Sequence, residues 1–502
     1  MKVPEGGLFF TEELSVKRTI TTGEVSSQAN DAKLVDIVVE RGDSHANSSL
    51  PAEWLKSIMK DGAESSSTAK IPKVPKMFRD SESNKGCFDP LAVSIGPYHH
   101  GKPELQEVEK LKIKMAKQYV NGTIDKSIQA DQDLASPLYQ KVKDVAGEAK
   151  TYYDFESSPS IDDESFTKMM FLDGCFVLQY IYSSVYAQQE MGMKIHHIAF
   201  VQRDLFLLEN QLPYIVLHAL MSTRLKAGEG KKMIHKFIKL NQVHHPPPTK
   251  WRNCLRNFIS FIFQCKNSAS QQSTDNSSST KDDQPLHLLD MMRKTLVGPE
   301  AKKALGAQPA GPDDNWSQRY QSAKELKTVG IRFRANKSSY YTDVKFSSTR
   351  LLYGKLTLPP LSIDDSTKSM LLNMLAFETC PDCPDDFWVT SYICFIDSLI
   401  NNAEDVTLLR SQNILLNYLG SDQDVADLFN GIAKYLAPNP RTYVDVKKQI
   451  KAHYNNRFKI WMAEWLDDHF SSPWTVLAFL GAVFAIFLSV IQTYVAIHPP
   501  SS

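Results

Sequence analysis

The chain has 502 residues, of which 42% are hydrophobic and 10% aromatic, a composition typical of a folded globular protein. A chain of this length exceeds what one hydrophobic core usually supports, so we expect two packed lobes. Lysine plus arginine equals aspartate plus glutamate, at 57 each. This balance argues against a nucleic-acid partner and gives no reason to expect a strongly acidic substrate.

The N-terminal region, residues 1–70, is polar and contains clusters of serine and charged residues, so we expect it to be mostly disordered. Charged residues are spread through the first twenty positions, which therefore do not form the apolar segment of a secretory signal peptide. Order is expected to begin at residues 71–75, where two prolines favour an extended backbone.

A first helical lobe is predicted over residues 71–266. Pro103 suits the first turn of a helix, and apolar positions recur behind it at helical spacing. The stripe consists of Leu105, Val108, Leu111 or Lys112, Met115 and Tyr119. We expect this stripe to face the core.

Two further segments of this lobe have a helical pattern. Residues 166–182 are apolar on nearly every side and predict a central core helix, because Asp173 and Gly174 at its middle disfavour a membrane span. Residues 204–220 predict a helix, a break and a second helix that starts near Pro213.

A serine-rich insertion separates this lobe from the next. Residues 267–284 contain no large apolar residue across eighteen positions, so they cannot bury enough surface to offset their ordering entropy and are predicted to be disordered. A second lobe is expected at 285–440, with short strands at 331–333 and 355–358. The predicted fold class is mainly α with a minor β component: a two-lobed helical globular region plus one C-terminal transmembrane helix.

The transmembrane helix is predicted from residues 474–497, which are 24 consecutive uncharged residues. As a helix they would be ~36 Å long, against a hydrocarbon core of roughly 30 Å, so membrane lipid is an expected partner. The basic, amphipathic juxtamembrane segment 441–473 is expected either to lie along the membrane or to pack beneath the lobe. Gly481, Ala485 and Ser489 recur every four positions, a spacing that permits a homodimer but also occurs in helices that span alone.

The orientation of this single-pass protein is predicted from charge. Basic residues precede the apolar stretch and none follows it, which favours a cytosolic globular part. Seven widely spread cysteines suit free thiols in a reducing compartment. Glycosylation sequons, including those at Asn121 and Asn336, leave an extracellular orientation open. Plasma membrane and endomembrane are not distinguished.

Sequence motifs of the common enzyme classes are absent. The chain has no phosphate-binding glycine loop, no G-x-S-x-G elbow and no H-E-x-x-H zinc helix. Cys380 and Cys383 form a lone C-x-x-C pair, whereas a zinc site of this type would need a second pair. We therefore expect no catalytic residues, no cofactor and no metal.

One corner of the chain could still hold a site. Residues 93–101 contain Gly-Pro and a second glycine, so they are expected to turn sharply and to present Tyr98 and His99. That corner is either a ligand site or a packing corner whose polar groups satisfy backbone atoms. Glu209, which lies among leucines, is likewise either a catalytic acid or a structural tie at the helix break.

Several blocks resemble, in order, the signature of the plant family called domain of unknown function 247. The blocks are Val93-Ser94-Ile95-Gly96-Pro97-Tyr98-His99-His100-Gly101, Phe171-Leu172-Asp173-Gly174-Cys175-Phe176, residues 204–213, Glu325-Leu326, Gly330-Ile331-Arg332-Phe333, Ala376-Phe377-Glu378, Leu419-Gly420-Ser421-Asp422 and Ser472-Pro473-Trp474. The similarity covers about residues 71 to 497. Thr379 and Asn413 depart from the usual glutamine and glycine.

The resemblance implies a plant-specific protein with a C-terminal membrane span and no established enzymatic activity. Some grass members of the family are associated with self-incompatibility loci, which implies recognition between pollen and stigma and would be easiest with an extracellular globular part. We therefore expect a membrane-anchored protein that acts in recognition or signalling by binding an unknown protein. The alternative is a membrane-tethered enzyme of unknown reaction with a site near Tyr98, His99, Asp173 and Glu209.

Overall fold

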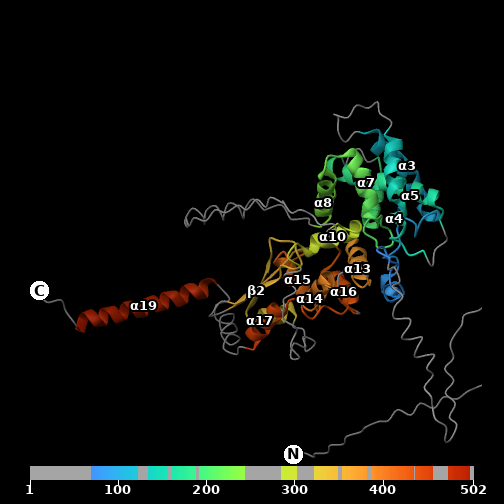
Figure 1. The fold of residues 1–502 in the computed structure, drawn as a ribbon. Coiled ribbons are helices and arrows are strands. Elements are labelled where there is room, and N and C mark those ends of the chain that lie inside the picture. The colour runs from blue at the N-terminus through green and yellow to red at the C-terminus, as the bar shows by residue number, and fades with distance from the viewer. Residues whose placement is uncertain are drawn as a thin grey trace, which may run out of the picture. The chain divides into compact units, whose positions relative to one another are not determined.

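The computed structural model describes residues 69–122, 134–155, 161–187, 192–242, 284–301, 322–348, 353–381, 386–434, 436–455 and 473–497. Within these residues the fold is mainly helical with a few short strands, which confirms the predicted fold class (Figure 1). The predicted disordered regions, apart from residues 69, 70 and 284, lie outside the described residues.

The N-terminal half of the described chain forms a group of helices. They are α2 (Lys76–Arg79), α3 (Gln106–Asn121), α4 (Ala135–Lys150), α5 (Asp163–Tyr186), α6 (Ile195–Asp204), α7 (Tyr214–Arg224) and α8 (Glu229–Gln242), with 3-10 turns at Glu82–Asn84 and Pro103–Leu105. Helices α3, α4, α7 and α8 all pack against α5, beside which they are drawn in Figure 1. The predicted core helix at 166–182 is therefore confirmed as the centre of this group.

Local sequence explains why these helices start and pack as they do. The Asp162 carboxylate caps α5 by accepting hydrogen bonds from the backbone N–H groups of Glu164 and Ser165. Gly174 lets α5 approach α7 closely, since a Cβ at this position would lie 2.5 Å from Leu220 Cδ1. The predicted stripe of α3 is buried, and of the two candidates at its centre it is Lys112 that is completely buried.

The C-terminal half has more helices. They are α10 (Leu288–Val297), α12 (Ala323–Thr328), α13 (Thr367–Glu378), α14 (Trp388–Asp397), α15 (Ala403–Ser411), α16 (Asp422–Ala433) and α17 (Val444–Tyr454). Capping boxes start α12, α15 and α16, with Ser322, Asn402 and Ser421 as the N-cap residues. Helix α17 packs against strand β2 (Lys345–Ser348), and its buried residues are Val446, Ile450 and His453. Residues 456–472 of the predicted juxtamembrane segment lie outside the described residues.

Two small sheets accompany these helices. The first has the order β1-β3-β2, and the second pairs β4 with β5. The strands are β1 (Ile331–Ala335), β2 (Lys345–Ser348), β3 (Gly354–Leu358), β4 (Leu361–Ile363) and β5 (Leu415–Asn417). Strand β3 is parallel to β1, with Phe333 opposite Leu356, and antiparallel to β2. Both predicted strands are confirmed within β1 and β3.

The predicted helix break differs from the observed one. Helix α6 ends at Asp204, where the prediction begins its first helix, and an irregular segment follows before α7 starts at Tyr214, directly after Pro213. The chain remains irregular over 205–213 because the side chains of Asn210 and Gln211 take up main-chain carbonyls that a helix would otherwise satisfy.

The last helix, α19 (Pro473–Ile497), has an unusual surface. Its stretch Leu477–Tyr494 has a mean hydropathy of 2.0 and is 0% buried. Among the described residues it is the one helix long and apolar enough to cross a membrane, judged by length and composition. Helix α5 is nearly as long, but most of its residues are buried in protein.

Candidate functional site

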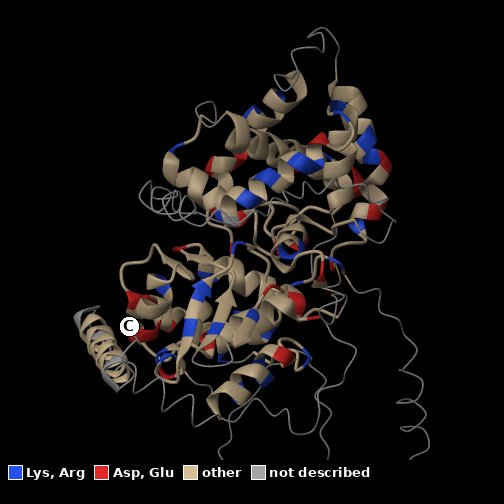
Figure 2. Cartoon of the chain, turned by 90° about the vertical axis from the view of Figure 1, so that its left-hand side faces the viewer, with Lys and Arg blue, Asp and Glu red and all other residues tan. Residues whose placement is uncertain are grey.

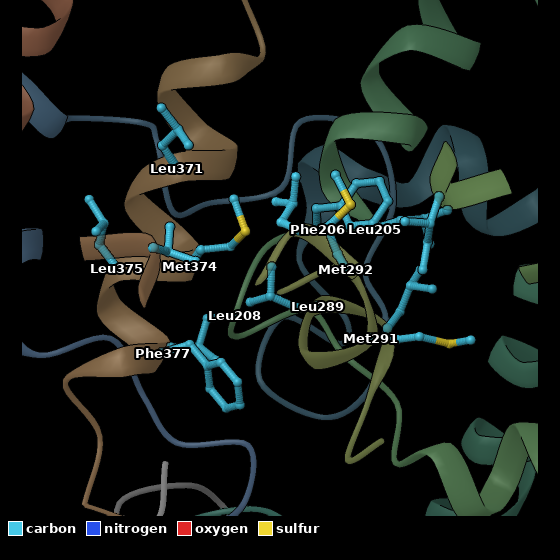
Figure 3. Close-up of a cluster of buried hydrophobic side chains, with 14 of the residues drawn as sticks. Leu205, Phe206, Leu208, Leu289, Met291, Met292, Leu371, Met374, Leu375 and Phe377 are labelled. Carbon is cyan, nitrogen blue, oxygen red and sulfur yellow. The ribbon is translucent and has the colours of Figure 1, made fainter. Parts of the chain in front are cut away.

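Residues 204–213, which are the last residue of α6 and the irregular segment after it, lie at the centre of the described fold. Its apolar side chains form one cluster with residues of α10 and α13, which Figure 3 shows in close-up. The cluster includes Leu205, Phe206, Leu208, Leu289, Met292, Met374 and Phe377. Its polar side chains, in contrast, hydrogen-bond to backbone groups far away in the sequence. This segment therefore connects parts of the chain that precede and follow it.

Asp204 ties the start of the segment to residues 91–93. Its carboxylate accepts hydrogen bonds from the backbone N–H groups of Leu91, Ala92 and Val93, the shortest being 2.7 Å from Ala92. The guanidinium of Arg203 lies 3.0 Å from the same carboxylate. Burial nevertheless leaves the pKa of Asp204 raised, since these partners only partly offset the loss of water. The carboxylate acts as a fully buried anchor for the backbone.

The two amide side chains of the segment are also fully engaged. Asn210 Oδ1 accepts a 2.7 Å hydrogen bond from the N–H of Ile95, and its amide nitrogen donates to the carbonyls of Val93 and Asp204. Gln211 Oε1 accepts from the N–H of Leu289 at the start of α10. These side chains therefore satisfy buried backbone groups that no regular element pairs.

Asn373 of α13 makes the matching contact from the C-terminal half. Its Oδ1 accepts a 2.8 Å hydrogen bond from the N–H of Leu208, and its amide nitrogen donates to the carbonyl of Cys87. The Ser369 hydroxyl donates to the same carbonyl. The two halves of the described fold are thus joined by hydrogen bonds as well as by the apolar cluster.

The predicted corner at residues 93–101 is held from beneath by Asp173. Gly96 has a φ of +75°, and a Cβ there would lie 2.9 Å from the carbonyl oxygen of Gln211, so only glycine fits. The Gly96 N–H donates to Asp173 Oδ2 at 2.9 Å, while Lys112 Nζ lies 2.7 Å from Asp173 Oδ1. Asp173, one of the candidate site residues, therefore has a structural role, since its buried carboxylate holds Gly96 and Lys112.

Lys112 completes this buried ion pair. Burial alone would lower its pKa, but the adjacent carboxylates of Asp173 and Glu109 hold it above its ordinary value, so the ammonium stays charged. Its Nζ also donates to the carbonyl of Ser94. One cation thus joins α3, α5 and the corner.

Tyr98 is likewise committed to packing. Its hydroxyl donates to the carbonyl of Ile71 at 2.7 Å and accepts from the N–H of Asp154 at 2.8 Å. The ring makes an edge contact with Tyr153, at 5.6 Å between centroids. Burial raises the pKa of Tyr98 well above its ordinary value, so the phenol remains protonated.

Glu209 and His99 lie together on the other side of the corner. Glu209 Oε1 accepts from the N–H of Val74 at 2.7 Å, and its Oε2 lies 2.6 Å from the Arg79 guanidinium. His99 Nε2 lies 3.7 Å from that same Oε2, beyond hydrogen-bond range. Neither ring nitrogen of His99 has a hydrogen-bond partner among the described residues, and the side chain is only 4% exposed.

The charge state of His99 follows from this environment. Burial lowers the pKa of His99 to about 4, and the nearby ammonium of Lys102 lowers it further, against the opposing effect of Asp89. The imidazole is therefore neutral at pH 7. An uncharged histidine next to a carboxylate that already has two partners is a weak acid–base pair in this state.

The four predicted site residues thus surround one corner without sharing a pocket. Tyr98, His99 and Glu209 lie near residues 71–79, while Asp173 lies beneath Gly96. One hollow among the described residues, of about 580 Å³, is lined by Met77, Phe78, Thr379, Phe387, Thr390 and residues 436–441, and another holds about 130 Å³. None of the four lines either hollow.

Sequence reasoning missed a second buried ion pair, in the Ala-Phe-Glu block. Glu378 accepts hydrogen bonds from the N–H groups of Val389 and Thr390 at the start of α14. Its Oε1 lies 2.8 Å from Nε of Arg293, which also contacts Asp386. The only available signal was a glutamate at the end of an apolar run, and its partner lies 85 positions away.

A metal centre is not formed by the residues that the structure describes, which contain no group of three or more histidine, cysteine, aspartate or glutamate side chains able to hold an ion. Cys380 is buried and its thiol donates to the carbonyl of Ala376. Cys383, the other half of the C-x-x-C pair, lies outside the described residues.

Comparison with known proteins gives a consistent assignment. Residues 71–488 match a family model described as a plant protein of unknown function, DUF247. The UPF0481 protein At3g47200 of Arabidopsis thaliana is 28% identical over 453 residues, covering 84% of this chain and 86% of the relative. The putative UPF0481 protein At3g02645 of the same plant is 21% identical over 498 residues, covering 85% and 90%.

No solved structure matches the chain significantly. The family match nevertheless covers well over half of the chain, including the corner, the 204–213 segment, the Ala-Phe-Glu block and most of α19. The chain therefore belongs to the plant protein family of domain of unknown function 247.

Proposed function

We propose that this is a membrane-anchored plant protein that acts in recognition or signalling by binding another protein through its helical domain. The observation that carries the proposal is how the distinctive polar residues are used. Asp173, Asp204, Glu209 and Glu378 each bind backbone N–H groups and a buried or half-buried cation. Carboxylates engaged in this way stabilise the fold, which supports a binding role over a catalytic one.

The membrane part of the proposal rests on α19. A contiguous apolar surface of this size is not stable in water, and among the described residues only this helix combines such length with such exposure. We place the globular domain on the cytosolic side because the basic residues precede α19. Cell–cell recognition, including self-incompatibility, requires the opposite orientation.

A topology experiment tests this orientation. A glycosylation acceptor is attached after Ser502 and a tag is placed at the N-terminus of the full chain, and intact membranes are then treated with protease. We expect a glycosylated tail and a digestible domain. A protected domain glycosylated at Asn121 or Asn336 would reverse the orientation and favour cell–cell recognition.

The second candidate function, a membrane-tethered enzyme, is favoured by one observation. His99 is buried beside Glu209, and within the described part of the chain its two ring nitrogens have no hydrogen-bond partner. A bound substrate could complete this arrangement. Full-length protein and its His99→Gln variant are incubated with a plant metabolite extract and the products compared by mass spectrometry. Turnover that disappears with His99→Gln, in a variant that remains folded, would replace the binding proposal with an enzymatic one.

A further inference from the structure

The first sheet has one buried face and one exposed face, and the exposed face is basic. Buried and exposed residues alternate along β1, buried and half-buried residues alternate along β3, and Phe346 is the buried residue of β2. The inward residues are Ile331, Phe333, Phe346, Leu356 and Leu358. The outward residues include Arg332, Arg334, Lys345 and Lys355, which we call the basic sheet face. Figure 2 shows the corresponding blue segments on these strands.

Strand register brings these cations together. Arg332 is directly opposite Lys355, and Thr357 lies between Arg334 on one side and Lys345 on the other. Since neighbouring strands are about 5 Å apart, the four charges occupy a patch of roughly 10 Å by 10 Å. Like charges this close repel one another, and an anionic surface laid over them would relieve the repulsion.

The balancing charge within the protein is small. Lys345 pairs with Asp343, but Arg332, Arg334 and Lys355 have no carboxylate partner among the described residues. Arg332 instead stacks on the ring of Tyr353, 4.1 Å from its centroid, and this ring is 38% exposed. An exposed tyrosine among cations is the composition found where proteins meet the headgroup region of a bilayer.

The chain limits how far this sheet can lie from a membrane that α19 spans. Helix α17 packs against β2 and ends at Tyr454, so the connection to α19 starts beside the sheet. Only residues 456–472 separate the described part of the domain from α19, and a chain of that length spans at most about 60 Å. Tethering of this kind gives a weak surface contact a high effective concentration.

We propose that the basic sheet face docks on the anionic lipid headgroups of the membrane that α19 spans. The proposal rests on the membrane anchoring proposed above and adds a second contact that orients the domain. Anionic lipid is favoured over RNA or an acidic protein because the tether keeps the lipid near the sheet at all times. Each cation near an anionic membrane raises the bound population about fivefold.

Lysine footprinting of the full-length protein tests this contact. The protein is reconstituted in nanodiscs of phosphatidylcholine alone or with 30% phosphatidylserine, and acetylation rates are measured by mass spectrometry. We expect phosphatidylserine to slow acetylation of Lys355 about tenfold, and high salt to abolish the effect. Lys226, Lys231 and Lys232 are exposed near the start of α8 and serve as internal references. Their rates should change little.

Two double variants, each of which removes two positive charges, distinguish docking of the basic sheet face from general electrostatic attraction. In R332S/R334S the slowing at Lys355 should be lost, whereas in K231S/K232S it should persist. Equal acetylation rates of Lys355 in the two lipid mixtures would overturn the proposal. So would equal slowing of acetylation at Lys231, or protection of Lys355 by added RNA but not by phosphatidylserine. Release of the protein from membranes by alkaline carbonate would overturn the membrane anchoring itself. This extraction is carried out before any acetylation experiment.

Discussion

Helices α5 and α19 have similar lengths, 24 and 25 residues, and both are largely apolar, yet they have opposite surroundings. Helix α5 is enclosed by α3, α4, α7 and α8, whereas the stretch Leu477–Tyr494 of α19 is 0% buried among the described residues. The difference lies in a few residues. Asp173 in α5 meets Lys112 and the N–H of Gly96, and Gly174 admits α7.

The comparison teaches that a polar residue in an apolar helix indicates a protein core when the fold supplies a partner for it. An unpaired carboxylate at a bilayer centre costs about 3 kcal/mol, whereas the Asp173 carboxylate has a cation and a backbone donor. Helix α19 has no charged side chain between Leu477 and Tyr494. Four changes break or sharpen this contrast.

The largest effect is expected from breaking the ion pair of α5. Lys112→Met leaves Asp173 charged and buried with no cation, so the free energy of unfolding should fall by about 3–5 kcal/mol. Chemical denaturation of the full chain in detergent measures the loss. Lys117→Met, at an exposed position of the same helix, serves as the control and should cost little. The double variant K112M/D173N should recover part of the loss, and a loss below about 1 kcal/mol would show that the pair is dispensable.

The pH dependence of stability is expected to come from buried histidines of the globular domain. In the folded protein the pKa of His99 is lowered to about 4, whereas in the unfolded chain it should be near 6.5. Between these values the unfolded state binds more protons, so the free energy of unfolding should fall as pH decreases from 6.5 to 4. The contribution of His99 to this fall is about 3 kcal/mol. Burial also lowers the pKa of His287 to about 4, which adds a loss of the same sign.

Thermal unfolding at pH 6.5 and 4.5 checks this expectation. His99→Gln should flatten the dependence by about 1.4 kcal/mol per pH unit. His100→Gln, at the exposed neighbouring position, should leave the slope unchanged. Identical slopes in wild type and His99→Gln would mean that His99 does not remain neutral in the folded protein.

A smaller effect is expected where α5 approaches α7. Gly174→Val places a branched side chain where even a Cβ would be 2.5 Å from Leu220 Cδ1, and overpacking of this kind costs about 1–3 kcal/mol. Gly481→Val in α19 should leave the stability of the globular domain unchanged, because a Cβ at this position would meet no atom of the described residues within 4 Å beyond its own helix backbone. Denaturation of both variants under the same conditions gives the comparison, and equal losses would contradict the assignment of α5 to the core and α19 to the lipid.

These examples show how far the sequence determines the structure. Periodicity predicts the buried stripe of α3 and the strands around Phe333 and Leu356, because local patterns reflect local burial. It leaves Leu111 and Lys112 as alternatives, since the choice depends on Asp173, 61 positions away. The same limit applies to the candidate site. Tyr98, His99 and Glu209 are found near one another, but their role as packing groups depends on partners such as Ile71, Val74 and Arg79.

The irregular segment after Asp204 shows a different limit. Its apolar residues predict a helix, but side chains such as Gln211 replace the helical hydrogen bonds with longer-range ones. Sequence periodicity describes regular elements and carries no information about backbone groups that side chains satisfy. The ion pair between Glu378 and Arg293 was missed because the two residues are 85 positions apart, and periodicity does not indicate contacts between distant side chains.

The smallest expected effect concerns the surface of α19 and leaves the folded domain unchanged. Small residues at Gly481, Ala485 and Ser489 would allow two copies of α19 to approach closely, and helix association of this type contributes about 1–2 kcal/mol. We expect Gly481→Leu to lower the dimer population in bicelles by about fivefold to thirtyfold, measured by energy transfer between labelled copies. Ala482→Leu, one position round the helix, is the matched control and should leave the energy transfer near the wild-type value. If both variants transfer energy as the wild type does, α19 spans as a single helix, and its apolar surface then serves lipid contact alone.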